Sequence, residues 1–419
     1  MLWGSVGLGY TTSGRVLPTP VGPCQRRADY IEQEKARRQA SGRVSMPTLM
    51  ESINMPSSDL ILFTPGPVRI PPIVAEYLGN PPCNYHRQEA FCAMFAETEG
   101  DLKGLLGIRE PSAYFATTLT CTGTGANEAC LYALAGLGKG VILANGFFAA
   151  RIVDQARQAG LDHVVFDAAH DHPLDPDDVA SFLSKHPDVK WAFFVSHETR
   201  TGLANPMVDL GRTLKQRGLM VAADVVSSSY AYPIDLEAAQ LDLAVASSAK
   251  ALMAAPGIGI VLVRVDSARA LVARRRPGSY YLDVLAEFAR QRDTMQPRFA
   301  QPVVLHAAMR AACIHLKRVG IENHMQRIRR QLDSLAASLA SLGVERLLEP
   351  AYSGGIAVNF RLPAHMPYAA FSQNMQKRGY FLLYGIPGDQ SHFQVSTIGD
   401  LTDQHIAGIQ HAFSEVFAR

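Results

Sequence analysis

Short apolar runs recur along the chain from Leu60 onward, and most of them lack alternating polar positions. Runs of this kind are typical of strands that are covered on both faces, as in a parallel sheet. We therefore expect seven buried strands, at residues 113–119, 140–145, 163–166, 191–196, 219–225, 243–246 and 258–263.

Helical patterns lie between these strands, at residues 127–137, 149–158, 176–184 and 208–217. Asp175 stands directly before the third of them, where its side chain can cap the first turn. Repeated strand and helix units imply right-handed crossovers. The predicted fold class is α/β, with a large domain built on a mainly parallel sheet.

The pattern changes after Pro302. Two long helical stretches are followed by short strands, at residues 303–318, 321–342, 355–360, 380–384 and 392–396. We expect a smaller α+β domain there. The predicted boundaries are 57–300 for the large domain and 301–419 for the C-terminal domain.

Residues 1–56 mix Gly, Pro and Ser with charged residues and lack a sustained apolar period. They are expected to form a mobile N-terminal extension. Met46, Met50 and Met55 leave open a natural start further along the chain.

Composition narrows the class of protein. The chain has 419 residues, a formal net charge of +2 and 47% hydrophobic residues. This balance argues against nucleic-acid binding and favours small-molecule partners. No run reaches the ~18 apolar residues that a membrane span needs. The six cysteines include no C-x-x-C pair or zinc-like spacing, so no metal is expected and a reduced, cytoplasmic location fits.

Three features could carry chemistry, although each has a common structural explanation. The turn Thr122-Gly123-Thr124-Gly125 follows a strand and opens a helix, where backbone N–H groups can hold a phosphate. Asp224 ends a strand at the edge where ligands of open α/β sheets bind. Lys250 follows another strand among small residues, where burial would make its amine nucleophilic. Taken singly, they also fit a plain turn, a structural carboxylate and a surface lysine.

Together these features point to one cofactor. A phosphate cradle, a strand-end carboxylate and a lysine, in this order along an α/β chain, are the parts that pyridoxal 5'-phosphate (PLP) requires. Independent occurrence of all three by chance is improbable.

From about Leu60 to its C-terminus the chain resembles the class V aminotransferases of fold type I. Among these it is most similar to 2-aminoethylphosphonate:pyruvate and alanine:glyoxylate transaminases. The motifs that carry the resemblance are Phe63-Thr64-Pro65-Gly66-Pro67-Val68, His86-Arg87, Thr122-Gly123-Thr124, Asn145-Gly146-Phe147-Phe148, Glu198-Thr199-Arg200-Thr201-Gly202, Asp224-Val225-Val226-Ser227-Ser228 and Ser247-Ser248-Ala249-Lys250.

The resemblance implies a role for each motif. Lys250 would hold PLP as a Schiff base, and Asp224 would pair with the pyridine nitrogen. Phe148 would stack on the ring and Thr199 would contact the cofactor. The remaining cofactor-binding positions would be Thr122, Gly123, Thr124 and Ser248. The resemblance also implies a homodimer with its cofactor site at the subunit interface.

The chain departs from the family pattern at three places. Gln394 stands where the family carries an Arg that grips the substrate carboxylate. Pro297 and Ala300 stand where the partner subunit lends a Tyr and a Thr to the cofactor phosphate. Ala249 replaces the usual amide before the lysine.

Candidate replacements for the missing cation are Arg200 and Arg87, which could equally belong to structural ion pairs. His197 is expected either near a cofactor oxygen or in the core. The leading hypothesis is an aminotransferase that uses a small amine, 2-aminoethylphosphonate-like or an amino acid, and a keto acid.

Two alternatives remain open. A PLP-dependent lyase, aldolase or decarboxylase would explain the loss of the Arg at Gln394. A protein that binds PLP without turnover, or a nucleotide-binding module, is disfavoured by the intact set Lys250, Asp224 and Thr199.

Overall fold

The computed structural model describes residues 60–419, except 276–277, 386–387 and 418–419. Asp59–Arg419 forms one compact unit. The predicted extension, residues 1–56, lies outside the described residues.

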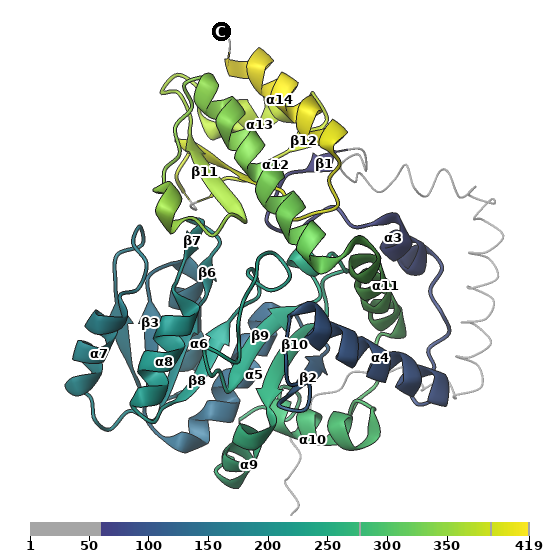
Figure 1. Cartoon of the computed structure of the whole chain (residues 1–419), viewed down its shortest axis with the longest axis vertical. Helices are drawn as coiled ribbons and strands as arrows, with labels where there is room; N and C mark the ends of the chain where they lie inside the picture. The colour runs from purple at the N-terminus through teal and green to yellow at the C-terminus, as the bar shows by residue number, and fades with distance from the viewer. Residues whose placement is uncertain (1–59, 276–277, 386–387, 418–419) are drawn as a thin grey trace, which may run out of the picture. The chain divides into compact units, whose positions relative to one another are not determined.

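A seven-stranded sheet lies at the centre of this unit (Figure 1). Strand β10 runs antiparallel to both of its neighbours, and all other pairs are parallel. The α/β, mainly parallel prediction is therefore confirmed, and each predicted strand overlaps an observed one. In spatial order the strands are β2 (Tyr114–Leu119), β10 (Gly259–Arg264), β9 (Leu243–Ser247), β8 (Met220–Asp224), β5 (Trp191–Val195), β3 (Gly140–Ala144) and β4 (His163–Asp167).

Both faces of the sheet are buried because helices cover each of them. In β3, Val141 and Leu143 belong to one core cluster, whereas Ile142 and Ala144 belong to the other. This alternation of two apolar faces explains the continuous apolar runs in the sequence. The first face packs against α4 (Glu89–Leu105), α7 (Pro176–Ser184), α8 (Met207–Gln216) and α11 (Val303–Val319), and the second against α5 (Gly123–Leu134), α6 (Phe147–Gln158), α9 (Val265–Ala273) and α10 (Val284–Thr294).

Two helix starts bear on the site. Asp175 caps α7 by accepting hydrogen bonds from the amides of Asp177 and Asp178, as predicted. Helix α5 begins at Gly123, four residues before the predicted start at 127. The glycines and threonine of the turn are thus part of the helix, so its N-terminus lies directly at the end of β2.

The C-terminal part has its own apolar core, as expected for a smaller α+β unit. Strand β11 (Ala357–Arg361) pairs antiparallel with β13 (His392–Ser396), and β1 (Ile61–Leu62) pairs with β12 (Tyr380–Phe381). The helices are α12 (Ile321–Ser341), α13 (Tyr368–Gln376) and α14 (Asp403–Phe417), while α3 (Pro72–Gly79) packs against α11. Ile328 of α12 lies in the core of the large sheet and Leu332 in the C-terminal core, so α12 connects the two.

A short hairpin, β6 (His197–Glu198) and β7 (Leu203–Ala204), joins these parts. Gly202 in its loop has φ +86°, and a Cβ there would lie 2.4 Å from the carbonyl oxygen of Ala357. Only glycine allows this close approach of the hairpin to β11.

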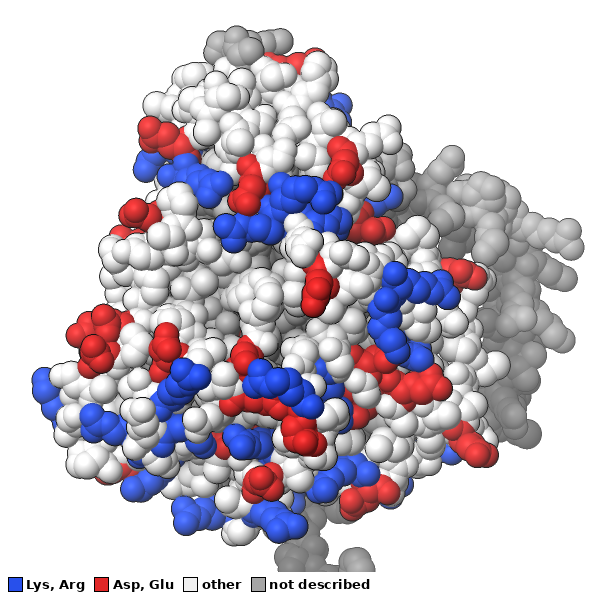
Figure 2. Space-filling view, viewed as in Figure 1, with Lys and Arg blue, Asp and Glu red and all other residues white. Residues whose placement is uncertain are grey.

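On the face shown in Figure 2, acidic and basic side chains lie intermixed, and most of the charged side chains gather over its lower half. None of the helices in the described part of the chain has the length and apolar character that crossing a bilayer demands.

Candidate active site

A pocket of about 200 Å³ opens at the carboxyl ends of the parallel strands. This is the edge at which open α/β sheets bind ligands. Its lining brings together most of the predicted cofactor residues: Thr122, Gly123, Thr124, Asn127, Phe148, Arg151, Val195, His197, Asp224, Val226, Ser227, Ser247, Ala249, Lys250 and Pro256.

Asp224 is the last residue of β8, and both of its carboxylate oxygens are held in place. Oδ2 accepts a hydrogen bond from Nδ2 of Asn127 at 2.6 Å, and Oδ1 accepts one from the amide of Val226 at 2.8 Å. Burial raises the pKa of Asp224, while these hydrogen bonds and the charge of Lys250 act in the opposite direction. The carboxylate is thus fixed in a site where a cationic partner would stabilise it.

Lys250 begins the turn η2 (Lys250–Leu252) directly after β9, and its backbone has φ +62°. Loss of solvent lowers the pKa of its amine to about 8, with the charges of Arg200 and Arg151 adding to the effect and Asp224 opposing it. A Cβ on Gly66 would lie 3.0 Å from Nζ. The amine therefore occupies a confined space and is easily deprotonated.

An anion cradle lies at the N-terminus of α5. Thr122 precedes the helix, and Gly123 and Thr124 form its first turn, where free amides and the helix dipole favour negative charge. Nη1 of Arg151 donates a hydrogen bond to Oγ1 of Thr124 at 3.3 Å, which places a cation at the same point. A Cβ on Gly123 would lie 2.9 Å from Val226, so glycine is required for this packing.

Phe148 lines the pocket from the first turn of α6. Its amide and that of Ala149 donate hydrogen bonds to the carboxylate of Glu198, at 2.9 and 2.7 Å. The guanidinium of Arg151 lies 5.0 Å from the centre of the Phe148 ring. Glu198 thus fixes the start of the helix that presents this aromatic ring.

Two predicted cofactor residues lie behind the pocket wall. Thr199 is buried, and its hydroxyl lies 2.5 Å from that of Ser227, which does line the pocket. The hydroxyl of Ser248 donates to the carbonyl of Ala255 at 2.6 Å, and it is the neighbouring Ser247 that lines the pocket. Thr199 and Ser248, which the resemblance places at the cofactor, are therefore not among the residues that line the pocket.

The three predicted substrate residues are not among those that line the pocket. Gln394 is buried, and its amide donates to the carbonyls of Thr199 and Arg200, at 2.7 and 3.2 Å. Arg200 packs between two aromatic rings next to the pocket. Arg87 is exposed and donates to the carbonyls of Pro297 and Arg298, at 2.6 and 2.9 Å.

The pocket contains polar groups that lack partners. Oδ1 of Asn127 and both ring nitrogens of His197 are buried and have no hydrogen-bond partner among the described residues. Buried polar groups are normally paired, so these atoms indicate a polar ligand. PLP fits the set: the cradle suits its phosphate, Asp224 its pyridine nitrogen, Lys250 its aldehyde and Phe148 its ring.

Sequence reasoning missed several residues here. Asn127 orients Asp224 from one turn inside α5, and Ser227 and Ser247 line the wall. Ser227 and Ser247 stand inside the quoted motifs, but Asn127 had no signal beyond its place in the helix that the glycine turn opens.

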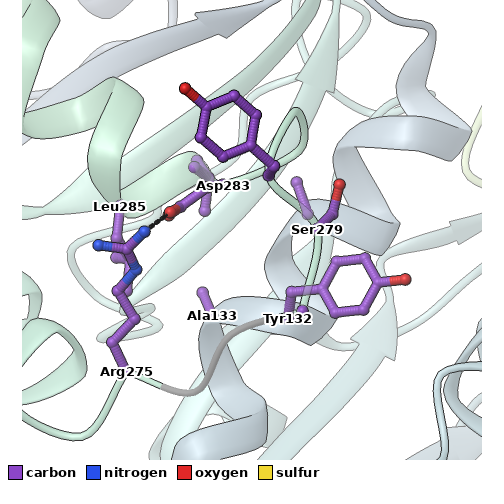
Figure 3. A pocket seen from close by; sticks show the side chains of 10 residues that line it. Tyr132, Ala133, Arg275, Ser279, Asp283 and Leu285 are labelled. Carbon is purple, nitrogen blue, oxygen red and sulfur yellow. Dashed lines mark hydrogen bonds and ion pairs between the residues drawn. The ribbon is translucent and has the colours of Figure 1, made fainter. Parts of the chain in front are cut away.

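A second pocket, shown in Figure 3, has a volume of about 250 Å³ and lies on the surface of α5. Arg275 and Asp283 form an ion pair across it, and the hydroxyl of Tyr132 donates to Glu128 at 3.0 Å. Its charged groups are therefore already paired, and it contains none of the candidate residues.

The fold and the site define a PLP-dependent enzyme of fold type I. Residues 70–374 match the model of the class-V aminotransferase family. The chain belongs to this family, and it is a PLP-dependent aminotransferase. The predicted resemblance is confirmed, and the lyase alternative is not favoured.

Individual relatives agree with this assignment. The chain is 30% identical to a 2-aminoethylphosphonate–pyruvate transaminase of Burkholderia pseudomallei over 84% of its own length and 95% of the relative's. It is similar in structure to an aspartate aminotransferase of Thermus thermophilus, with a TM-score of 0.75, 28% identity and coverage of 85% and 99%. An alanine–glyoxylate aminotransferase of Nostoc sp. shares the fold, with a TM-score of 0.80, 22% identity and coverage of 87% and 97%.

Proposed function

We propose that this aminotransferase takes the amino group of a small primary amine with an anionic tail, 2-aminoethylphosphonate or a relative, and transfers it to a keto acid. The observation that carries the proposal is a deprotonable amine, Lys250, in one pocket with the carboxylate of Asp224 and an anion cradle. The nature of the donor is supported by the names of the curated relatives.

When bound, PLP supplies an aldehyde to which amines attach covalently and a ring that accepts electrons. Lys250 would hold the aldehyde carbon until the donor amine displaces it. The freed amine, with its pKa of about 8, would then be suited to take the proton from the donor carbon and deliver it to the carbon that carried the aldehyde, so that the amino group stays with the cofactor. Asp224 would keep a proton on the ring nitrogen.

The other residues would bind and orient. Thr122, Gly123, Thr124 and Arg151 would hold the phosphate, because amides at a helix N-terminus and a guanidinium both favour an anion. Phe148 would stack on the ring. Ser227 would contact the cofactor and be oriented by Thr199, to which it is hydrogen-bonded.

The wider setting is also part of the proposal. We infer a place in phosphonate metabolism, which the relatives' names support. A cytoplasmic location is supported by six cysteines without a C-x-x-C pair. A homodimer is what the family resemblance implies. We also propose a large domain, 57–300, and a small domain, 301–419. The separate core around α13 and α14 supports this division, while α11 packs in the core of the large sheet.

The proposal is tested by mixing purified holoenzyme with a panel of amines, without a keto acid, and recording the absorption spectrum. A good donor should convert the aldehyde form of the cofactor fully into its amine form, and a keto acid should restore it. Lys250→Ala should lack both the initial band and the conversion. If the aldehyde form persists while product accumulates, transamination is wrong.

A further inference from the structure

Arg200 is a cation that has no carboxylate partner among the described residues. Its side chain is half-buried in the loop between β6 and β7 and, within the described part of the chain, forms no ion pair. Nη1 donates to the carbonyl of Gly385 at 3.0 Å. A guanidinium has five N–H donors in a planar fork, so most of its hydrogen-bonding capacity is unused.

The position of this cation is next to the cofactor pocket. Its guanidinium lies 5.2 Å from the ring centre of Phe147 and 5.5 Å from that of Tyr384. Phe147 precedes Phe148 and packs edge-on against it, with ring centres 5.7 Å apart. The charge of Arg200 also lowers the pKa of Lys250. The guanidinium is therefore within electrostatic reach of the reacting amine.

Two buried side-chain amides bind the backbone carbonyl of Arg200. Nδ2 of Asn359 donates to the carbonyl of Arg200 at 2.6 Å, and Nε2 of Gln394 donates to the same oxygen at 3.2 Å and to that of Thr199 at 2.7 Å. Asn359 and Gln394 are directly opposite each other in the β11–β13 pair. A pair of neutral donors thus fixes the backbone from which the cation projects.

We propose that Arg200 binds the anionic tail of the amine donor, with Gln394 and Asn359 as positioning residues; this inference rests on the proposed function. Gln394 carries no charge, and its amide is used in holding the loop. The planar fork of Arg200 matches either a phosphonate or a carboxylate, which share paired anionic oxygens. The two rings beside it hold the guanidinium in place through cation–π contacts.

The experiment compares wild type with Arg200→Gln, Arg200→Lys and a matched control, Arg157→Gln. Arg157 is exposed and pairs with Asp154 within α6, at 3.3 Å. Each holoenzyme is titrated with 2-aminoethylphosphonate, with its carboxylate counterpart 3-aminopropanoate and with neutral 3-aminopropanol. The absorption change gives a half-saturating concentration and a maximal rate for each amine.

Arg200→Gln should raise the half-saturating concentration of the anionic amines by about 10- to 100-fold, the worth of a charge-assisted hydrogen bond. The half-saturating concentration of 3-aminopropanol should change far less, because its uncharged tail gives Arg200 nothing to pair with, and its reaction also shows that the variant is folded. For the anionic amines, Arg200→Lys should have a half-saturating concentration between those of wild type and Arg200→Gln. Arg157→Gln should have the wild-type value. A larger loss for the phosphonate than for the carboxylate identifies the phosphonate as the preferred tail, and the reverse identifies the carboxylate.

Gln394→Ala and Asn359→Ala should raise the half-saturating concentration of anionic amines without changing the maximal rate for 3-aminopropanol. The inference is overturned if Arg200→Gln and Arg200→Lys retain the wild-type preference for anionic amines. It is also overturned if the half-saturating concentration rises by the same factor for all three amines. Failure of the proposed function looks different, because then no amine converts the cofactor of the wild-type enzyme.

Discussion

Lys250 and Asp224 show how burial prepares single residues for chemistry. Both lie at strand ends in one pocket, and their charges support each other. Desolvation makes the lysine easier to deprotonate, whereas hydrogen bonds from Asn127 and Val226 hold the carboxylate in place. The pair thus provides an amine that loses its proton at a pH of about 8, well below that of an ordinary lysine, next to a fixed carboxylate.

The pKa of Lys250 predicts how the apoenzyme captures PLP. Only the neutral amine attacks an aldehyde, so the capture rate should rise with pH and level off above about 8. An ordinary lysine would still gain about tenfold between pH 8 and 9, because its pKa lies near 10.4. Stopped-flow absorption at a series of pH values measures this, with Lys250→Ala as the blank. A rate that keeps climbing to pH 10 would contradict the prediction.

Asp224 should matter for turnover more than for cofactor retention. Asp224→Asn keeps the size of the side chain but removes the charge, and we expect kcat to fall by about 100-fold or more, as for other preorganised charges. Asn127→Ala removes one of the two hydrogen bonds to the carboxylate, and it should lower kcat by about tenfold. Half-reaction rates at saturating donor test both variants. A kcat within twofold of wild type for Asp224→Asn would rule out its role at the ring nitrogen.

The hairpin β6–β7 and helix α6 together form the aromatic side of the pocket. Glu198 in the hairpin caps α6, which carries Phe148. Burial raises the pKa of Glu198 to about 7. Its carboxyl group therefore binds a proton more tightly in the folded chain than in the unfolded one.

This shift predicts a pH dependence of stability. With a pKa raised from 4.5 to about 7, the contribution of Glu198 is fully present below pH 4.5 and is lost as the pH rises through 7. The unfolding free energy of wild type relative to Glu198→Gln should thus decline over this range. Urea unfolding of the apoenzyme at several pH values measures it, and a parallel pH dependence of the two proteins would disprove the shift.

The seven strands were predictable because each is a continuous apolar run between helices, and both faces of the sheet are covered. Sequence reasoning located the pocket for the same reason, since Asp224, Lys250 and the glycine turn all follow strands. The family resemblance implied Ser248 as a cofactor residue, and in the structure Ser247, the last residue of β9, lines the pocket. The partners of Gln394 come from the loop at Thr199 and Arg200, nearly 200 positions away, and no local pattern contains that contact.

An aromatic patch is exposed on the surface of the part of the molecule that contains the large sheet. It consists of Tyr280, Tyr281, Arg298 and Phe299. Tyr280 is 79% exposed and Tyr281 44%, Phe299 packs on both rings, and Arg298 lies over Tyr280 and Phe299. Exposed clusters of aromatic residues and arginine are typical of protein interfaces.

We expect this aromatic patch to take part in the proposed homodimer. Tyr280→Asp should weaken self-association at least about tenfold, because it replaces an aromatic anchor with a charge. Val319→Asp is a suitable control, since Val319 is 40% exposed and lies outside the aromatic patch. Sedimentation velocity over a dilution series measures both. Wild type that stays monomeric at high concentration would disprove the dimer, and unchanged association of Tyr280→Asp would exclude the aromatic patch.

The left-handed backbone of Lys250 has a consequence for the durability of the enzyme. With φ +62°, any residue with a Cβ is strained there by ~1 kcal/mol relative to glycine. The enzyme thus keeps its reactive amine at a position where the chain alone would prefer glycine. Lys250→Gly should therefore melt at a higher temperature than wild type when both lack PLP, so that the inactive protein outlasts the active one on heating. Heat resistance and catalysis are therefore opposed at this single position. Because PLP binds the folded chain, its binding raises the stability of the active enzyme and offsets the stability that the strained lysine costs.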